Sequence, residues 1–213
     1  MSSILITRPE HDDTTYYLSH WSKEIIALAD QKGIHIFDLN REKAVKLEVE
    51  SRLKKSYPNL VILNGHGNDT TVTGHKNEPL ISVGENESLL KSRIVYAISC
   101  KSAKVLGPKS IDAGALSYTG YDDDFIFMYD PNKISKPCSD ETAKLFLSHS
   151  QRFTESLIKG NTVKESFSRS KNILRENLMK SLSSDSKDNA LTRYLWWDLT
   201  HFVSHGDLNA AIS

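Results

Sequence analysis

Two residues of this sequence have the types and positions of a catalytic pair. His66 ends the apolar run in "LVILNGHGND" (60–69), where it stands between Gly65 and Gly67, and Cys100 ends the apolar run in "RIVYAISCKSA" (93–103). A histidine can accept the proton of a cysteine thiol and later return it to a leaving amine. The two residues therefore predict nucleophilic attack by a thiolate on a carbonyl group.

That reaction also needs hydrogen-bond donors for the oxyanion that forms on the attacked carbonyl. Gly67 has no side chain, so its backbone N–H can approach a substrate closely. The backbone N–H of Cys100 supplies a second donor. The sequence thus predicts His66 and Cys100 as catalytic residues, with Gly67 and Cys100 as the oxyanion hole.

The two residues can meet only if the surrounding elements form a parallel sheet. Short apolar runs at 3–7, 34–39, 60–63, 93–99 and 115–121 alternate with helical patterns, among them 13–33 and 41–57. This alternation predicts βαβ units and a mostly parallel sheet. Because ligands gather beyond the carboxyl ends of parallel strands, His66 and Cys100 are expected at the same edge.

Helix boundary signals support the same division of the chain. Asp13 or Thr14 is the expected N-cap of the first helix, and Gly33 is its expected stop. Residues 70–83 read as a β-hairpin, 139–160 and 161–182 as long helices, 183–188 as a linker, 189–199 as a helix and 200–208 as a final strand. Thr162 and Glu165 have capping-box spacing. No composition shift divides the chain, so residues 1–213 are predicted to be a single domain.

Composition excludes several classes of protein. The chain has 27 basic and 27 acidic residues, which gives no reason to expect a nucleic-acid-binding surface. Its two cysteines, Cys100 and Cys138, have no disulfide or CxxC pattern, and we expect a reduced, cytoplasmic protein. No segment has the roughly 20 apolar residues of a membrane span, so no membrane contact is predicted.

Each motif also has a simpler explanation when taken alone. A cysteine in an apolar strand is usually a small buried hydrophobe, and a His-Gly pair at a strand end is often a turn. Cys138 follows Pro137 at a helix start and is a weaker candidate nucleophile. The remaining histidines are interpreted as surface or structural residues: His11, His75, His149 and His205. Because no metal-ligand spacing such as HExxH is present, no metal site is predicted.

The motifs "VILNGHGN" and then "IVYAISCKSA" resemble the histidine and cysteine strands of caspase-like cysteine peptidases of the clan CD type. "GALSYTGY" and "HFVSHGDLN" are similar to later strands of that group, and the likeness points to its bacterial CHAT and gingipain-like domains. The resemblance implies a caspase-like sandwich, in which a mostly parallel six-stranded sheet has helices on both faces. It also implies a protein substrate, peptide-bond hydrolysis without a cofactor, and control by a partner or by cleavage.

The resemblance has limits around the nucleophile. Animal caspases carry Gln-Ala-Cys with a glycine two residues on, and place the histidine about 50 residues upstream. This chain has "ISCKS" and a shorter spacing, so specificity for aspartate is not carried over. In the family, loops after the first and fifth strands shape the substrate pocket. Here these loops are "RPEHDD" and "YDDD", and Asp12 and then Asp123 are predicted to bind a substrate Arg or Lys.

Three functions remain open from the sequence. The first is a cysteine endopeptidase regulated by an external partner or by cleavage. The resemblance also implies a role in bacterial defence or cell death, where members of that group sometimes act on gasdermin-like targets. The second is a catalytically silent caspase-like module that binds a partner in a regulatory complex. The third, a flavodoxin-type small-molecule binder, is disfavoured because the loops after the early strands contain no phosphate cradle.

Overall fold

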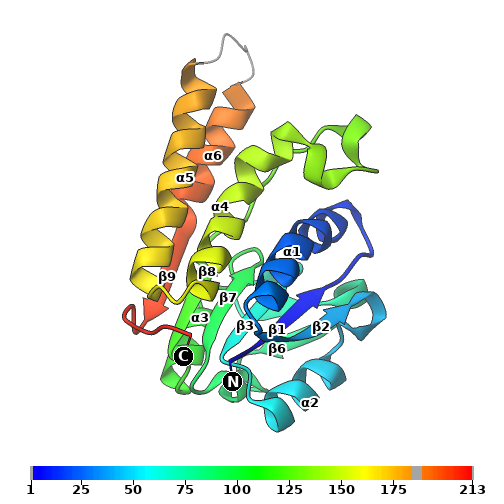
Figure 1. Cartoon of the computed structure of the whole chain (residues 1–213), viewed down its shortest axis with the longest axis vertical. Coiled ribbons are helices and arrows are strands. Elements are labelled where there is room, and N and C mark those ends of the chain that lie inside the picture. The colour runs from blue at the N-terminus through cyan, green and yellow to red at the C-terminus, as the bar shows by residue number, and fades with distance from the viewer. Residues whose placement is uncertain (1, 184–188, 213) are drawn as a thin grey trace.

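The computed structural model describes residues 2–183 and 189–212, and the central feature of this part of the chain is a six-stranded sheet (Figure 1). All neighbouring strands are parallel except the last pair. The strands, in spatial order, are β2 (His35–Asn40), β1 (Ser3–Arg8), β3 (Leu60–Asn64), β7 (Ile94–Ile98), β8 (Ser117–Tyr121) and the antiparallel β9 (Phe202–Gly206). The predicted α/β class and mostly parallel sheet are confirmed.

Helices cover both faces of this sheet because its strands are apolar on both sides. In β1, Ile4 and Ile6 face one apolar cluster and Leu5 faces the other. The first face carries α1 (Asp13–Gln31), α4 (Glu141–Ile158), α5 (Val163–Ser183) and α6 (Asn189–His201). The second carries α2 (Lys46–Ser56), α3 (Leu106–Asp112) and a small antiparallel sheet of β4 (Gly67–Asn68), β5 (Thr71–Thr73) and β6 (Pro79–Ser82).

Local signals fix most helix ends, with one correction. The N-cap of α1 is Asp12, one residue before the predicted position, because its side chain accepts a hydrogen bond from the Thr15 N–H. Gly33 stops the helix in a left-handed conformation, as expected. Thr162 and Glu165 form the predicted capping box at α5. Residues 184–188 of the expected linker lie outside the described residues.

The helix predicted over 41–57 is wrong in its first turns. A 3₁₀ turn, η1 (Arg41–Lys43), precedes α2, and Val45 between them is extended. The cause is tertiary, since the carbonyl of Ala44 accepts a hydrogen bond from the His75 N–H at 2.8 Å. Further 3₁₀ turns are η2 (His75–Asn77), η3 (Glu87–Leu90), η4 (Pro131–Lys133) and η5 (Pro137–Ser139).

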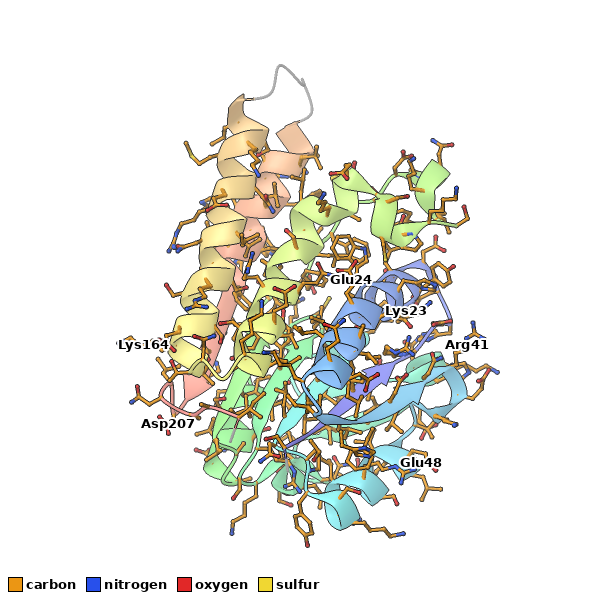
Figure 2. The ribbon with its side chains drawn as sticks, in the orientation of Figure 1. Lys23, Glu24, Arg41, Glu48, Lys164 and Asp207 are labelled. Atoms are coloured by element: carbon orange, nitrogen blue, oxygen red, sulfur yellow. The ribbon has the colours of Figure 1, made fainter. Side chains whose placement is uncertain are left out.

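The surface mixes charges of both signs, in keeping with a formal net charge of zero. Figure 2 labels exposed side chains of both charges, with Lys23 and Glu24 on α1, and Lys164 and Asp207 toward one edge of the view. Among the described residues, no helix has both the length and the apolar character needed to cross a membrane.

Candidate active site

The sheet brings the two predicted catalytic residues to one cleft. Strands β3 and β7 are parallel neighbours, with Asn64 paired to Ile98, and each candidate lies two residues beyond its strand. His66 and Cys100 both line a cavity of about 250 Å³ at the carboxyl edge of the sheet. The other lining residues are Thr14, Leu18, Gly65, Ser99, Phe125, Ile126 and Phe127.

The glycines on either side of His66 are required by close backbone packing. A Cβ atom on Gly65 would collide with the carbonyl of Thr73. A Cβ atom on Gly67 would collide with the Ser99 hydroxyl and lie 2.7 Å from the Thr71 carbonyl oxygen. Both glycines therefore let the chain turn off β3 and pass against the segment that carries Cys100.

His66 is held by a carboxylate from the first loop of the sheet edge. Its Nε2 atom lies 2.6 Å from Oδ2 of Asp12, while Oδ1 of Asp12 accepts the Thr15 N–H at 2.8 Å. Partial burial raises the pKa of Asp12, but the hydrogen bonds from Thr15 and His66 outweigh it and leave that pKa below its ordinary value. With the carboxylate ionised, Nε2–H of a neutral His66 donates a hydrogen bond to Oδ2 of Asp12, which leaves Nδ1 free to act as a base.

Cys100 lies at a tight turn directly after β7. Lys101 has a left-handed backbone (φ 59°), which is uncommon for a residue with a side chain, and its N–H donates to the Asp123 carbonyl at 2.9 Å. The Cys100 thiol lies 3.7 Å from the Phe125 carbonyl oxygen, to which it donates. Burial raises the pKa of the thiol above its ordinary value, so the resting group is protonated at neutral pH.

The two backbone donors predicted for the oxyanion hole are the N–H groups of Cys100 and Gly67. The Cys100 N–H has no acceptor among the described residues. Gly67 pairs with Val72 across β4 and β5, and the neighbouring Thr73 N–H donates to the His66 carbonyl at 2.8 Å. In this pattern Gly67 and Val72 are a non-hydrogen-bonded pair. The Gly67 N–H therefore has no acceptor on β5. Cys100 lines the cleft and Gly67 does not, so the oxyanion hole formed by these two N–H groups stays a prediction.

Helix α6 contacts residues 124–127, of which Phe125, Ile126 and Phe127 line the cleft. No sequence pattern predicted this contact. The Trp197 indole N–H donates to the Asp124 carbonyl at 2.9 Å, and the Ile126 N–H donates to Oδ1 of Asp198 at 3.1 Å. Asp198 is fully buried, and its Oδ2 has no partner among the described residues. Burial raises the pKa of Asp198 well above its ordinary value, which favours the neutral form of this carboxyl.

The two carboxylates predicted to bind a basic substrate side chain have other partners. Asp12 bonds to His66 and caps α1, and Asp123 lies 3.8 Å from the Lys101 ammonium group. Neither residue lines the cleft that contains His66 and Cys100. Their role in substrate binding stays a prediction. Cys138 lies away from this cleft, on η5, where its thiol donates to the His20 carbonyl.

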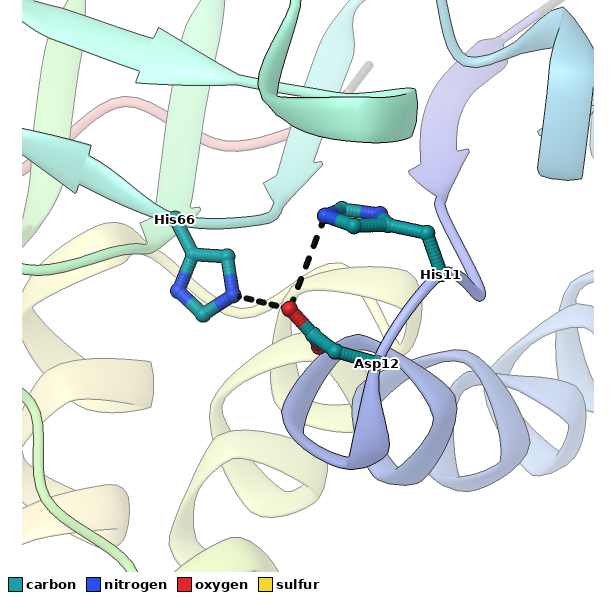
Figure 3. Close-up of side chains that lie close together, drawn as sticks. All are labelled: His11, Asp12 and His66. Carbon is teal, nitrogen blue, oxygen red and sulfur yellow. Dashed lines mark hydrogen bonds and ion pairs between the residues drawn. The ribbon is translucent and has the colours of Figure 1, made fainter.

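The other histidines have different surroundings. His149 is fully buried against Tyr121, and burial lowers its pKa to about 3, as expected for a structural residue. His205 contacts the Ala103 carbonyl. His11, in contrast, lies beside Asp12 and His66 (Figure 3), and of these three residues His66 lines the cleft. The sequence offered one signal for this placement, since His11 directly precedes Asp12 in the loop after β1.

In comparisons with known proteins, no family model matches the chain, and no curated protein matches it at a significant level. The fold and the side chains of the cleft are therefore what support a functional proposal.

Proposed function

We propose that this chain is a cysteine endopeptidase of the caspase-like type. The observation that carries the proposal is that His66 and Cys100 line one cleft while Asp12 holds Nε2 of His66. A sheet in which the histidine and cysteine strands are parallel neighbours supports a caspase-like sandwich as the finer fold. Fold alone does not establish function, so the residues of the cleft carry the argument.

The proposed mechanism uses His66 first as a base and then as an acid. Nδ1 of His66 accepts the thiol proton as Cys100 Sγ attacks the carbonyl carbon of the scissile peptide bond. The backbone N–H groups of Gly67 and Cys100 stabilise the oxyanion. His66 then donates the proton to the leaving amine, which breaks the C–N bond and leaves a thioester on Cys100. Water, deprotonated by His66, hydrolyses the thioester and regenerates the thiol.

The walls of the cleft favour an apolar substrate side chain. Leu18, Phe125, Ile126 and Phe127 line it, and such surfaces bind substrates through apolar burial. The preference for Arg or Lys predicted from Asp12 and Asp123 is the competing expectation. A positional-scanning peptide library separates the two, because a basic preference that weakens in Asp123→Asn would support the carboxylates over the apolar wall.

The test of the reaction itself combines labelling with turnover. A peptide bearing a thiol-reactive electrophile should label Cys100 in the native chain, and His66→Ala should slow that labelling. Cys100→Ala and His66→Ala should each abolish hydrolysis of a verified peptide, with a double variant little worse than either single one. Cys138→Ala is the matched control, since Cys138 lies outside the cleft. Wild-type turnover by Cys100→Ala would overturn the proposal.

A second candidate is a catalytically silent caspase-like module that binds a partner in a regulatory complex. One observation favours it, namely that the Cys100 thiol has a raised pKa and donates to the Phe125 carbonyl. A silent module would show no labelling of Cys100 above that of a denatured control and no turnover with any peptide, while retaining a native fold.

A further inference from the structure

Three metal-binding side chains gather at His66, which lines the cleft. His11 Nε2, an oxygen of Asp12 and a ring nitrogen of His66 all lie within 4.8 Å of one another. His11 Nε2 is 3.5 Å from Oδ2 of Asp12, and His66 Nε2 is 2.6 Å from the same oxygen. Figure 3 shows both rings directed at this carboxylate from two different segments, the loop after β1 and the turn after β3.

The surroundings of His11 leave its ring available as a ligand. Its side chain is only 12% exposed, yet Nδ1 has no hydrogen-bond partner among the described residues. Besides Asp12, Nε2 has only a long contact of 3.3 Å with the Asn77 side-chain oxygen. The backbone is fixed, because the His11 and Asp12 N–H groups both donate to the Thr15 hydroxyl. The ring is thus positioned by the capping box of α1 and weakly engaged.

The two distances that involve Asp12 fit a small tetrahedral cation after a modest adjustment. Zinc binds histidine nitrogen and carboxylate oxygen at about 2.0–2.2 Å, so its ligand atoms lie about 3.4 Å apart. The His11–Asp12 distance of 3.5 Å already matches. The His66–Asp12 distance of 2.6 Å must lengthen by about 0.8 Å, as the cation replaces the shared proton.

The donor set favours a nitrogen-binding cation such as zinc over calcium or magnesium. Two imidazoles with one carboxylate suit zinc, whereas calcium and magnesium prefer oxygen ligands throughout. Three protein ligands also leave a fourth position for water. We propose that His11, Asp12 and His66 form a Zn²⁺ site that shares His66 and Asp12 with the peptidase centre, so that bound zinc reversibly inhibits hydrolysis. The inhibitory part rests on the proposed function, and the binding part does not.

Inhibition follows from the position of the shared ligands. Zinc bound to Nε2 of His66 also coordinates the carboxylate of Asp12. That carboxylate then no longer accepts a hydrogen bond from the imidazole. A neutral imidazole that binds zinc through Nε2 carries its one proton on Nδ1, so Nδ1 has no lone pair with which to accept the thiol proton. The sequence shows no metal spacing because His11 and His66 lie in separate segments of the chain.

Binding is tested without reference to activity. The Cys100→Ala, Cys138→Ala chain is titrated with ZnCl₂ by calorimetry and with Co²⁺ by visible absorption, which reports tetrahedral nitrogen and oxygen ligation. We expect the chain to bind one equivalent of the metal. His11→Ala should lower the metal affinity by more than the 10–100-fold lost when a residue behind a ligand is removed. His11→Gln repeats the test if His11→Ala does not fold. His35→Ala, which removes an exposed imidazole on β2, should bind zinc as the parent does.

Inhibition is tested on the active chain with a verified peptide. Zinc should inhibit the wild type and His35→Ala at the concentration at which it binds, and a chelator should restore the rate. For His11→Ala, each rate is compared with the zinc-free rate of the same variant. The zinc concentration that inhibits this variant should rise by the same factor as its dissociation constant for zinc. Unchanged binding in both His11 variants, or zinc that activates, overturns the inference. Stoichiometric binding by a chain that hydrolyses no peptide would instead refute the proposed function and the inhibitory role, leaving the metal site.

Discussion

Oδ2 of Asp12 lies 2.6 Å from Nε2 of His66, across 54 positions of sequence. The same carboxylate caps α1 through its other oxygen, so one residue both starts the first helix and orients the imidazole. The imidazole is therefore held by a rigid element, since α1 packs against the sheet. This relationship makes Asp12 a positioning residue for His66 in the proposed reaction.

The first prediction separates these two roles of Asp12. In Asp12→Asn, the amide oxygen can still cap α1, but the amide NH₂ faces Nε2 of His66 and demands the opposite tautomer. We expect kcat to fall by on the order of 10²–10⁴, the usual contribution of acid–base catalysis, with KM little changed. The thermal midpoint should barely change because Asn and Asp are equal N-caps.

Asp13→Asn is the matched control for this prediction, since it removes a carboxylate from the next residue of the same helix. Asp13 accepts a hydrogen bond from Tyr129 and has no contact with His66. Because folding lowers the pKa of Asp12, its ionised carboxylate stabilises the folded state. This contribution is fully present above pH 3.8 and is lost as the pH falls through the lowered pKa of the folded chain. If Asp12→Asn kept wild-type kcat, Asp12 would have no positioning role.

The second prediction concerns Gly67. In Gly67→Ala, the new methyl group collides with Ser99 and approaches the Thr71 carbonyl, so the backbone must shift beside Cys100. We expect a loss of about 1–3 kcal/mol in the free energy of unfolding, as for overpacked sites. Expressed as a free energy, the loss in kcat/KM should exceed the loss in stability, because the Gly67 N–H is a proposed oxyanion donor. Both quantities are measured by urea unfolding and by kcat/KM.

Gly84→Ala is the comparison for that experiment. Gly84 has a left-handed backbone (φ +76°), but a Cβ atom there meets no atom within 4 Å. It should therefore lose stability through backbone strain alone and keep its activity. Equal effects of the two substitutions on kcat/KM would remove the special role of Gly67.

The third prediction concerns the buried carboxyl of Asp198. Burial raises its pKa, so the folded state keeps a proton that the unfolded chain releases above its ordinary value of 3.8. The free energy of unfolding should then fall as the pH rises above 3.8, until the folded pKa is reached. Asp198→Asn retains an oxygen for the Ile126 N–H and cannot ionise. At neutral pH it should gain about 1.4 kcal/mol for each unit by which the folded pKa of Asp198 exceeds 3.8, less the cost of burying the amide NH₂.

The measurement is urea unfolding between pH 4 and pH 9. Asp198→Asn should show a smaller decline in stability with pH than the wild type, whereas Asp112→Asn, at an exposed position on α3, should follow the wild type. Identical pH profiles for Asp198→Asn and the wild type would show that Asp198 is already ionised in the fold.

The fourth prediction concerns regulation. The uncut chain by itself should be weakly active, because burial raises the pKa of the Cys100 thiol and thiolate is scarce at neutral pH. The loops expected to complete the substrate site lie at 122–137 and 183–187. In the first, Asp122 bonds to His201 at 2.8 Å, and residues 184–187 of the second lie outside the described residues.

A partner or a cut that reorders these loops would raise activity by positioning the substrate, an effect worth up to roughly 7–11 kcal/mol of barrier. The measurement compares peptide turnover by the purified chain before and after limited proteolysis, and with added candidate partners. Full turnover by the uncut monomer without any partner would contradict this prediction.

The sequence by itself determined the parts that depend on local physics. Apolar runs placed β3 and β7, and the residues that end them, His66 and Cys100, were correctly expected at neighbouring strand ends. Gly33 and the Thr162–Glu165 pair marked helix ends through backbone geometry and capping, which a few adjacent residues decide. Such features follow from alternation, turn conformation and caps, and need no knowledge of the rest of the chain.

Only the tertiary structure decided which distant groups meet. Asp12 could cap a helix or bind a substrate on sequence grounds, and the order of strands β1, β3 and β7 is what placed it against His66. Asp198 lies 72 positions from Ile126, and its burial depends on how α6 packs over the cleft wall. Contacts of this kind come from sheet order and helix packing, which arise from the summed burial of many side chains rather than from any local pattern.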